Sequence, residues 1–468
     1  MLFSSITFLY CFLPVVLFLY YLLPGFLKNP WLLLASLFFY GWGEPKYIVF
    51  MLVSILAGYI LGLCIEKYQD TKQAKLFLIC SLFISLGMLG YFKYANFFIH
   101  NINAVFNTNI GILKIVMPIG ISFYTFQILS YTIDVYRKDV PAQRNLISLA
   151  TYISLFPQLI AGPIVRYSDV ELQLNDRKHS KEKFALGIRR FVMGLSKKIL
   201  IANQLGELCD IFFASNDKSV LFYWLYTISF MLHIYFDFSG YSDMAIGLGK
   251  MLGFDFMENF NYPYIAKSIT DFWRRWHISL SSWFRDYLYI PLGGSRVSKL
   301  RNWMNLMITF LVSGAWHGAS WHFIAWGGIH GAYQIVGKWK RSLIKKELPK
   351  VLQMAGTFVL VCFGWMVFRA NSLGDVKSMI LLIITKPFFK DLPAMNMSDM
   401  EWALLVLSLL VLLAVNLLQE KKISVRQLVI KRSFLVRIAL YVLGIGSILV
   451  FGVYGVAYDA SQFLYFQF

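Results

Sequence analysis

The sequence predicts an all-α protein that crosses a membrane many times, and three observations lead to this prediction. Of its 468 residues, 58% are hydrophobic and only 15% are charged, whereas soluble proteins carry about 25% charged residues. Apolar runs long enough to span the hydrocarbon core of a bilayer recur along the chain. Lysine and arginine are concentrated between these runs, as expected of cytoplasmic loops. The chain is therefore expected to lie mostly in lipid.

The candidate spans begin close to the N-terminus. The first, 4–24, lacks a basic leader region and a small-residue cleavage site, so we expect a retained transmembrane segment and not a signal peptide. The others are 31–42 continuing into 47–66, 75–93, 115–133, 146–165, 219–238, 304–336, 351–369, 402–418 and 434–457. Gly or Pro interrupts several of them, which is tolerated where a helix faces protein or a water-filled cavity. By length, we expect about 9–12 transmembrane helices.

Basic amphipathic stretches separate these spans. Their residues are 166–199, 266–301, 337–350 and 419–437. Such stretches are typical of helices that lie in the cytoplasmic interface of a membrane. Their alternation with apolar helices favours a bundle that encloses a tunnel or cavity. Because neither an internal repeat nor a linker interrupts the pattern, we expect a single integral membrane domain over residues 1–468.

Several classes of function are disfavoured by the sequence. A net charge of +19 would suggest nucleic-acid binding in a soluble protein, but here the charge follows the membrane topology, so no nucleic-acid partner is expected. Five cysteines without a CxxC pair suit neither a disulfide framework nor a zinc site. The motifs GxGxxG, GKS/T, GxSxG and HExxH are absent. On one continuous helix, His317 and His322 would point in different directions, so no metal is expected.

The first candidate for chemistry is a histidine in SGAWHGASWHFIAWGGIHG, residues 313–331. His317 lies in the middle of an apolar run, where an ionisable group is costly, and an imidazole can accept and return a proton near neutral pH. Gly314, Gly318 and Ala319 leave room beside it for a ligand or for a closely packed helix. The alternative is a buried histidine that simply bonds to a neighbouring helix.

The second candidate is DFWRRWHISLSSWFRDYLYIPLGG, residues 271–294. Its aromatic residues expected to share one helical face are Trp273, Trp276 and Phe284. Arg274 and Arg275 could bind lipid phosphates or the phosphates of a nucleotide-like cofactor. His277 is the group here that titrates near neutrality. An interfacial aromatic belt with snorkelling arginines is the alternative.

The third candidate is HIYFDFSGYSDMAIGLGK, residues 233–250, which places Asp237 and Asp243 in an apolar stretch. We expect the SGYS sequence, which includes Tyr241, to break the helix and to line a cavity. The two carboxylates would orient a ring nitrogen or pair with an arginine. A helix-capping and turn role is the alternative.

Together these stretches resemble the membrane-bound O-acyltransferase (MBOAT) family, within it most closely the alginate O-acetyltransferase, AlgI-like branch. The resemblance covers nearly the whole chain, and its specificity comes from the order and spacing of the motifs. Besides the three stretches above, the matching segments are LFSSITFLYCFLPVVLFLYYLLP, LLLASLFFYGWGEPKY, MPIGISFYTFQILSYTIDVYR, SLFPQLIAGPIVRY and FGWMVFRA.

The resemblance implies an active site built from two histidines on different helices. The near-invariant family histidine corresponds to His317, and its upstream partner, Asn or His in the family, corresponds to His277. His317 would be the general base, and His277 would donate a hydrogen bond to the carbonyl oxygen or position the acceptor. His322 and His330 are expected to be packing residues.

The resemblance also implies the substrates and the walls of a tunnel through the bilayer. Acetyl-CoA would be the cytosolic donor, with no metal and no further cofactor. Its phosphates would contact Arg274 and Arg275, with Trp273 beside them. The residues expected to line the tunnel are Trp316, Asp237 and Tyr241.

The implied acceptor is an extracytoplasmic polysaccharide, either an alginate-like exopolysaccharide or peptidoglycan. Such systems commonly use a second, exported acetyltransferase of the SGNH-hydrolase type, so a partner protein is expected. The location would be the bacterial plasma (inner) membrane. DltB-like D-alanyl transfer to teichoic acid is one alternative function, and a polysaccharide transporter or flippase is another.

Overall fold

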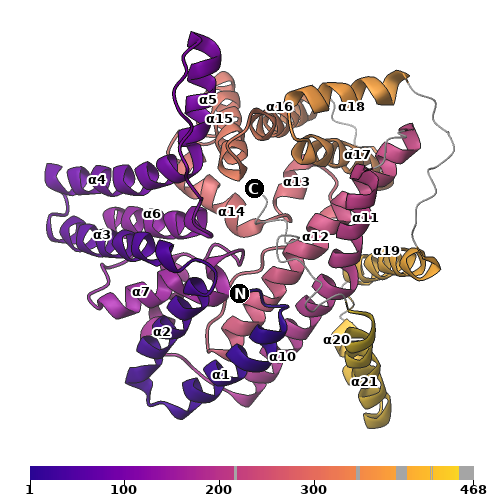
Figure 1. The fold of residues 1–468 in the computed structure, drawn as a ribbon, viewed down its shortest axis with the longest axis horizontal. Coiled ribbons are helices and arrows are strands. Elements are labelled where there is room, and N and C mark those ends of the chain that lie inside the picture. The colour runs from indigo at the N-terminus through magenta and orange to yellow at the C-terminus, as the bar shows by residue number, and fades with distance from the viewer. Residues whose placement is uncertain (215–218, 344–347, 386–397, 422, 424, 453–468) are drawn as a thin grey trace.

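A computed structural model describes residues 1–214, 219–343, 348–385, 398–421, 423 and 425–452, and every regular element in these ranges is helical (Figure 1). Helices long and apolar enough to cross a membrane are Pro45–Lys67, Lys72–Phe106, Val220–Met251, Lys350–Arg369 and Phe434–Phe451. The prediction of an all-α, polytopic membrane protein is confirmed. Residues 453–457 of the last predicted span lie outside the described residues.

The first half of the chain forms eleven α-helices. Their bounds are α1 (Leu13–Leu22), α2 (Lys28–Gly41), α3 (Ile48–Lys67), α4 (Lys72–Leu89), α5 (Ala95–Phe106), α6 (Ile121–Arg137), α7 (Leu146–Ser154), α8 (Phe156–Leu159), α9 (Tyr167–Asn175), α10 (Lys181–Ser196) and α11 (Asn203–Ala214). Single π-helical turns precede or extend several of them, at Thr7–Phe12, Gly90–Tyr94 and Lys197–Ala202. The predicted span 146–165 is divided at Leu155, two residues before Pro157.

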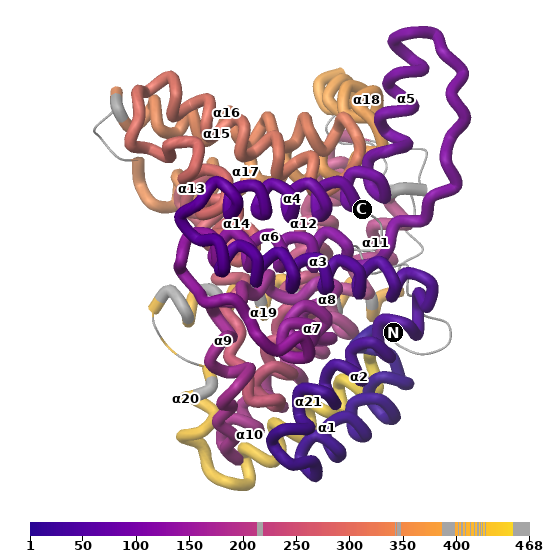
Figure 2. Tube along the Cα trace, turned by 90° about the vertical axis from the view of Figure 1, so that its left-hand side faces the viewer, coloured from indigo at the N-terminus to yellow at the C-terminus, as the bar shows by residue number. Residues whose placement is uncertain are grey.

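The remaining described residues form ten α-helices. Their bounds are α12 (Val220–Met251), α13 (Ile269–Trp273), α14 (Ile278–Phe284), α15 (Lys299–His317), α16 (Trp321–Leu343), α17 (Lys350–Arg369), α18 (Leu373–Thr385), α19 (Asp399–Glu420), α20 (Val425–Ile430) and α21 (Phe434–Phe451). A π-helical turn, Arg285–Tyr289, follows α14. The helices α3, α4 and α6 lie side by side, and in Figure 2 they run in roughly the same direction as α15 and α16.

The helix connections divide into two faces of different charge. The basic face consists of the connections 67–72, 137–146, 175–181, 251–269 and 284–299. Ion pairs within or across them include Lys138–Asp70 at 2.6 Å and Lys183–Asp255 at 2.7 Å. The opposite face consists of the connections 41–48, 106–121, 317–321 and 369–373, whose basic residues are Lys46, Lys114 and Arg369.

Helix α12 runs unbroken from Val220 to Met251, through the SGYS sequence that was predicted to interrupt it. That prediction is wrong because Gly240 serves helix packing. A Cβ built on Gly240 would lie 2.9 Å from the carbonyl oxygen of Gly194 on α10. Gly247 makes the same close approach to Gly187, where its Cβ would lie 2.7 Å from the backbone oxygen. Small residues let the backbones of two membrane helices come together in this way.

The predicted span 304–336 is two helices. Helix α15 ends at His317, and α16 begins at Trp321 and packs back against it. The two helices cross at Gly314 and Gly327, where a Cβ on either residue would lie 2.2 Å from a carbonyl oxygen of the other helix. The expectation of one continuous helix was therefore wrong, and the angle inferred between His317 and His322 does not apply. Gly314, three residues before His317, therefore leaves room for the backbone of α16.

Candidate active site

His277 lies between two short helices, α13 and α14, and its backbone is in the left-handed region (φ 43°, ψ 57°). A non-glycine residue is held there at some energetic cost, which is common at functional sites. The segment 259–261 supports this conformation. Ile278 N–H donates to the Asn259 carbonyl oxygen at 2.9 Å, and Asn261 N–H donates to the Arg275 carbonyl oxygen at 2.8 Å.

The interruption between α13 and α14 also changes the predicted arrangement of the aromatic side chains. Trp273 and Trp276 belong to the main hydrophobic core, whereas Phe284 belongs to a smaller cluster with Trp283 and Trp316. The expectation that Trp273, Trp276 and Phe284 share one helical face is therefore wrong. The sequence pattern suits a helix, but the chain turns between Arg274 and His277.

The side chain of Asn259 determines which ring nitrogen of His277 carries the proton. Asn259 Oδ1 accepts the backbone N–H of Ser279 at 3.2 Å and the Ser279 hydroxyl at 2.9 Å. Because a backbone N–H can only donate, the atom facing it is the amide oxygen. His277 Nδ1 lies 3.1 Å from this oxygen and must therefore carry a hydrogen. Its Nε2 is left as a buried acceptor with no hydrogen-bond partner among the described residues.

His317 is the last residue of α15, and its ring is enclosed by aromatic rings on three sides. The ring centroids of Trp316 and Trp326 are each 5.1 Å from that of His317, and Phe368 is at 5.3 Å. Trp316 also contacts His277, with ring centroids 6.5 Å apart. The structure thus brings the two predicted histidines together around one indole, although they come from different segments of the chain.

A cavity of about 290 Å³ lies beside His317 on the side of the opposite face. Its lining residues are Glu44, Lys93, 116–123, Ile160, Trp316 and His317. The loop that forms its rim is held by Glu44, whose carboxylate accepts the backbone N–H of Ile119 at 2.9 Å. Val116 of this loop is exposed. The cavity therefore connects the imidazole of His317 with the surface at the opposite face.

Lys93 and Tyr94 hold the end of α15, and sequence reasoning missed both. Lys93 Nζ donates to the carbonyl oxygens of Trp316 at 2.6 Å and His317 at 3.2 Å. The Tyr94 hydroxyl donates to the carbonyl oxygen of Ala315 at 2.7 Å. The last carbonyls of a helix have no partner within it, and a cation there is favourable. The available signal was a lysine at the end of an apolar run.

Trp316 is held in place by an aromatic cluster between α6, α14 and α15. Its ring stacks on Phe126 with centroids 5.3 Å apart, and Trp283 stacks on the same phenylalanine at 3.8 Å. Trp283 also donates its indole N–H to the Phe126 carbonyl oxygen at 3.1 Å. This stacking keeps the indole between the two histidines.

The predicted donor-binding residues have different environments. Arg274 is exposed in the turn between α13 and α14. Arg275 forms an ion pair with Asp271 at 2.9 Å and donates to the Asn261 carbonyl oxygen at 3.3 Å. Trp273 is buried and donates its indole N–H to His330 Nδ1 at 3.3 Å. Of the three, Arg274 is the one whose side chain is accessible to a ligand.

The predicted tunnel-lining residues do not lie together. Trp316 lines the cavity beside His317, but Asp237 and Tyr241 are absent from its lining. Asp237 forms a buried ion pair with Lys198 of the π-helical turn Lys197–Ala202. Tyr241 stacks on Phe3 with ring centroids 4.5 Å apart. Both side chains therefore contribute to the packing between α12 and its neighbours.

Three further predicted polar residues have structural contacts. Asp243 pairs with Arg190 at 2.7 Å and with Lys197 at 2.6 Å, so one of the predicted alternatives, pairing with an arginine, is confirmed. His330 accepts from Trp273 and lies beside Gly364, where an added Cβ would be 2.6 Å from its ring. His322 Nδ1 lies 2.8 Å from the Ser320 hydroxyl.

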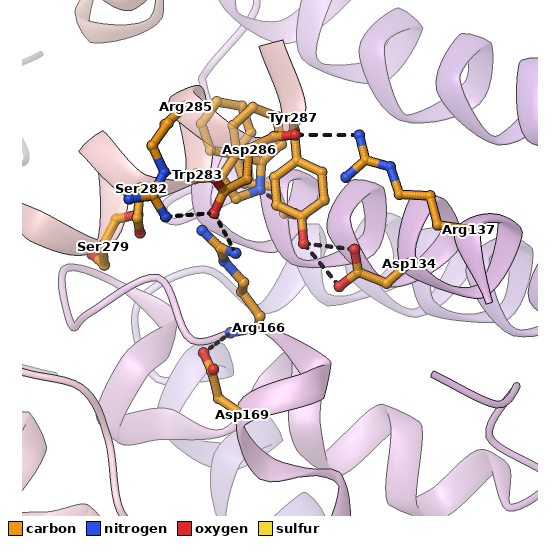
Figure 3. A network of polar contacts seen from close by, with 11 residues as sticks. Asp134, Arg137, Arg166, Asp169, Ser279, Ser282, Trp283, Arg285, Asp286 and Tyr287 are labelled. Atoms are coloured by element: carbon orange, nitrogen blue, oxygen red, sulfur yellow. Dashed lines mark hydrogen bonds and ion pairs between the residues drawn. The ribbon is translucent and has the colours of Figure 1, made fainter. Parts of the chain in front are cut away.

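A network of charged residues joins three segments at the basic face, as Figure 3 shows. Arg166 pairs with Asp286 at 2.9 Å, and Arg285 pairs with the same carboxylate at 2.6 Å. Burial opposes ionisation of Asp286, but the hydrogen bonds from Arg285 and Arg166 outweigh it and lower the pKa of this carboxyl. Tyr287 donates to both carboxylate oxygens of Asp134 at 2.8 Å. The network fixes the end of α14 against α6.

Comparison with known proteins matches this chain to one family model and to several proteins that are named as acyl-transferring enzymes. The family model described as MBOAT, membrane-bound O-acyltransferase family, matches residues 137–374. A protein named "Probable alginate O-acetylase AlgI" from Azotobacter vinelandii is 46% identical over 379 residues, which cover 80% of this chain and 76% of that protein. The "Peptidoglycan O-acetyltransferase" of Helicobacter pylori is 38% identical over 80% of this chain and 78% of its own. A "Teichoic acid D-alanyltransferase" from Bacillus subtilis is 31% identical over 54% and 69%, respectively.

Proposed function

This chain belongs to the membrane-bound O-acyltransferase family and is an acyltransferase, and on that premise we propose that it moves an acetyl group from cytosolic acetyl-CoA across the membrane for the O-acetylation of an extracytoplasmic polysaccharide. One observation carries the proposal. His277 and His317 contact the same indole, and His317 lines a cavity that reaches the opposite face. A proton acceptor inside the membrane with access for an alcohol is what O-acylation requires.

His317 acts as the general base. Its ring nitrogens have no hydrogen-bond partner among the described residues, so they are available to a substrate. As the acceptor hydroxyl attacks the thioester carbonyl carbon, its proton passes to His317. The tetrahedral intermediate then collapses, the carbon–sulfur bond breaks, and the thiolate takes the proton from the imidazolium. The products are the acetyl ester and coenzyme A with a free thiol.

His277 positions the acceptor. Because Asn259 holds the hydrogen on Nδ1, the neutral ring presents an acceptor nitrogen at Nε2. It can receive a hydrogen bond from a hydroxyl, but it cannot donate one to a carbonyl oxygen in this tautomer. The geometry therefore favours the positioning role over the hydrogen-bond donation that was the other expectation for this residue.

The donor approaches from the basic face, which we assign to the cytoplasm because lysine and arginine are enriched there. Acetyl-CoA carries several phosphate charges, and the exposed Arg274 is placed to contact them. The acceptor approaches from the opposite face, which would be extracytoplasmic in a bacterial plasma membrane. An exported acetyltransferase of the SGNH-hydrolase type would then complete the transfer to the polymer.

Alginate-like exopolysaccharide and peptidoglycan are the acceptors that the relatives' names suggest. The O-acetyltransferases match a larger share of the chain than the D-alanyltransferase does, which favours acetyl over D-alanyl transfer. Family membership likewise favours an acyltransferase over the polysaccharide transporter considered from the sequence.

The test is His317→Ala in the full chain, with His322→Ala as the matched control. Membranes are supplied with radiolabelled acetyl-CoA, and ester-linked acetyl groups in polysaccharide are measured. Loss of a general base lowers the rate by about 10²–10⁴-fold, whereas His322→Ala stays active because its ring bonds only to Ser320 among the described residues. A fully active His317→Ala protein would contradict the proposal. In a parallel assay the membranes receive a radiolabelled D-alanyl carrier protein, and incorporation of D-alanine without incorporation of acetyl groups would also contradict it.

A further inference from the structure

We propose that Lys93 is a further catalytic residue of the acyl transfer, which stabilises the oxyanion that forms next to His317. The inference rests on the proposed function, because it needs a thioester carbonyl at this place. Three observations carry it: the contacts of Lys93 with the end of α15, its position in the wall of the cavity, and the tautomer of His277.

The contacts fix the ammonium group next to the base. Lys93 lies in the π-helical turn Gly90–Tyr94, 224 residues before His317 in the sequence. Its Nζ bonds to the carbonyl oxygens of Trp316 and His317 and lies 5.8 Å from the Trp316 ring centroid. π-Helical turns within longer helices frequently occur at functional sites. Here the turn carries the lysine whose side chain reaches the end of α15.

The ammonium keeps one donor for a ligand. A protonated lysine has three N–H donors, and its hydrogen bonds to described residues use two of them. The same side chain lines the cavity together with His317. The third N–H is therefore available to a negatively charged oxygen bound beside the imidazole. Glu44 is the other charged residue in the lining, and its carboxylate already accepts the Ile119 N–H.

The reaction needs such a donor, and His277 does not supply it. When the alcohol oxygen adds to the carbonyl carbon, the carbonyl electron pair moves to oxygen and the hydroxyl proton moves to His317. The resulting oxyanion needs a hydrogen-bond donor or a cation. His277 in its neutral form offers an acceptor at Nε2. Lys93 offers both a donor and a positive charge, and it returns to its initial state when the thiolate leaves.

Three substitutions separate this role from a purely structural one. Lys93→Met removes both charge and donors, Lys93→Gln keeps hydrogen-bonding ability without charge, and Lys93→Arg keeps both. We expect kcat to fall by about 10²–10³-fold in Lys93→Met, as for loss of an oxyanion donor, with KM for acetyl-CoA unchanged. Lys93→Arg recovers a large part of kcat, and Lys93→Gln does not. Lys46→Met, at an exposed lysine on the opposite face, is the control.

The outcomes are distinguishable from failure of the proposed function. If Lys93→Met turns over at the normal rate while His317→Ala is inactive, the role of Lys93 is overturned and the proposed function stands. If His317→Ala is fully active, the proposed function itself is overturned. Should Lys93→Met not accumulate in membranes, Lys93→Gln and Lys93→Arg decide, and equal kcat in these two proteins would overturn the role of the charge.

Discussion

Asn259 determines the chemistry of His277 from a position 18 residues earlier in the sequence. Its amide oxygen receives the Ser279 N–H, the Ser279 hydroxyl and the His277 ring N–H, and all three groups are buried. Leaving buried donors without an acceptor costs about 1–3 kcal/mol for each group. The asparagine therefore contributes to the stability of the α13–α14 turn and also orients the imidazole.

For this reason we expect Asn259→Ala to lower both stability and turnover. The rate of acetyl transfer should fall at least about tenfold, the cost of one misplaced hydrogen bond, and the free energy of unfolding should fall by about 1–3 kcal/mol. Thermal unfolding in detergent and the acetyl-transfer assay measure the two effects. Asn259→Asp keeps an acceptor and should retain more activity, and Asn175→Ala, at an exposed site, should change neither quantity. A fully active Asn259→Ala protein would show that the tautomer of His277 is unimportant.

The sequence identifies some of the residues at this site and leaves others undetected, for a physical reason. His277 and His317 are ionisable groups in apolar stretches. Because placing such a group in the membrane costs free energy, their position alone predicts a functional role. Asn259 has no unusual local context, and the position of Lys93 at the end of an apolar run does not reveal its partner. Their importance comes from contacts with segments 18 to 224 residues away, which depend on how the helices pack.

At the scale of elements, glycine residues lie where helices pack closely, but the sequence alone does not show which structural role a given glycine has. The same residue type suits a break, a ligand site or a close crossing of two backbones. Gly240 was expected at a break but lies inside α12, against α10. The chain does break at Gly318, which no pattern distinguished from Gly314. Apolar composition predicts that helices are present more reliably than it predicts where they end.

The crossing at Gly314 gives a direct test of this packing. A Cβ there would lie 2.2 Å from the Phe323 carbonyl oxygen, so Gly314→Ala must push α15 and α16 apart. We expect a loss of about 1–3 kcal/mol in unfolding free energy, typical of overpacking, and reduced activity because His317 ends α15. Gly337→Ala in α16 has no heavy atom within 4 Å of the new Cβ and should stabilise the helix by about 0.5–1 kcal/mol. Equal melting temperatures for the two variants would contradict this view of the crossing.

At the scale of the whole molecule, the two faces have different tasks. The basic face carries the charged network around Asp286, whereas the opposite face carries the cavity that leads to His317. The histidines lie between them. A bundle of this kind can receive an anionic donor on one side and an alcohol on the other, without moving either substrate through lipid.

This division makes a prediction about orientation in the membrane. Lys114, exposed in the connection 106–121, belongs to the opposite face, and Lys178, exposed in the connection 175–181, belongs to the basic face. Because positively charged loops stay in the cytoplasm, Lys114→Cys should react with a membrane-impermeant maleimide in intact cells. Lys178→Cys should react only after the cells are permeabilised. The native cysteines, Cys11, Cys64, Cys80, Cys209 and Cys362, are replaced first.

The labelling pattern tests the direction of the reaction independently of any activity. If Lys178→Cys were labelled in intact cells and Lys114→Cys were protected, the cavity beside His317 would open to the cytoplasm. An extracellular polymer could then not reach the base through it, and the acceptor would have to be a cytosolic alcohol. If Lys114→Cys alone is labelled in intact cells, the thioester and the hydroxyl reach the imidazole of His317 from different sides of the membrane. The acetyl group must then cross the plane of the two histidines, while coenzyme A stays on the cytoplasmic side.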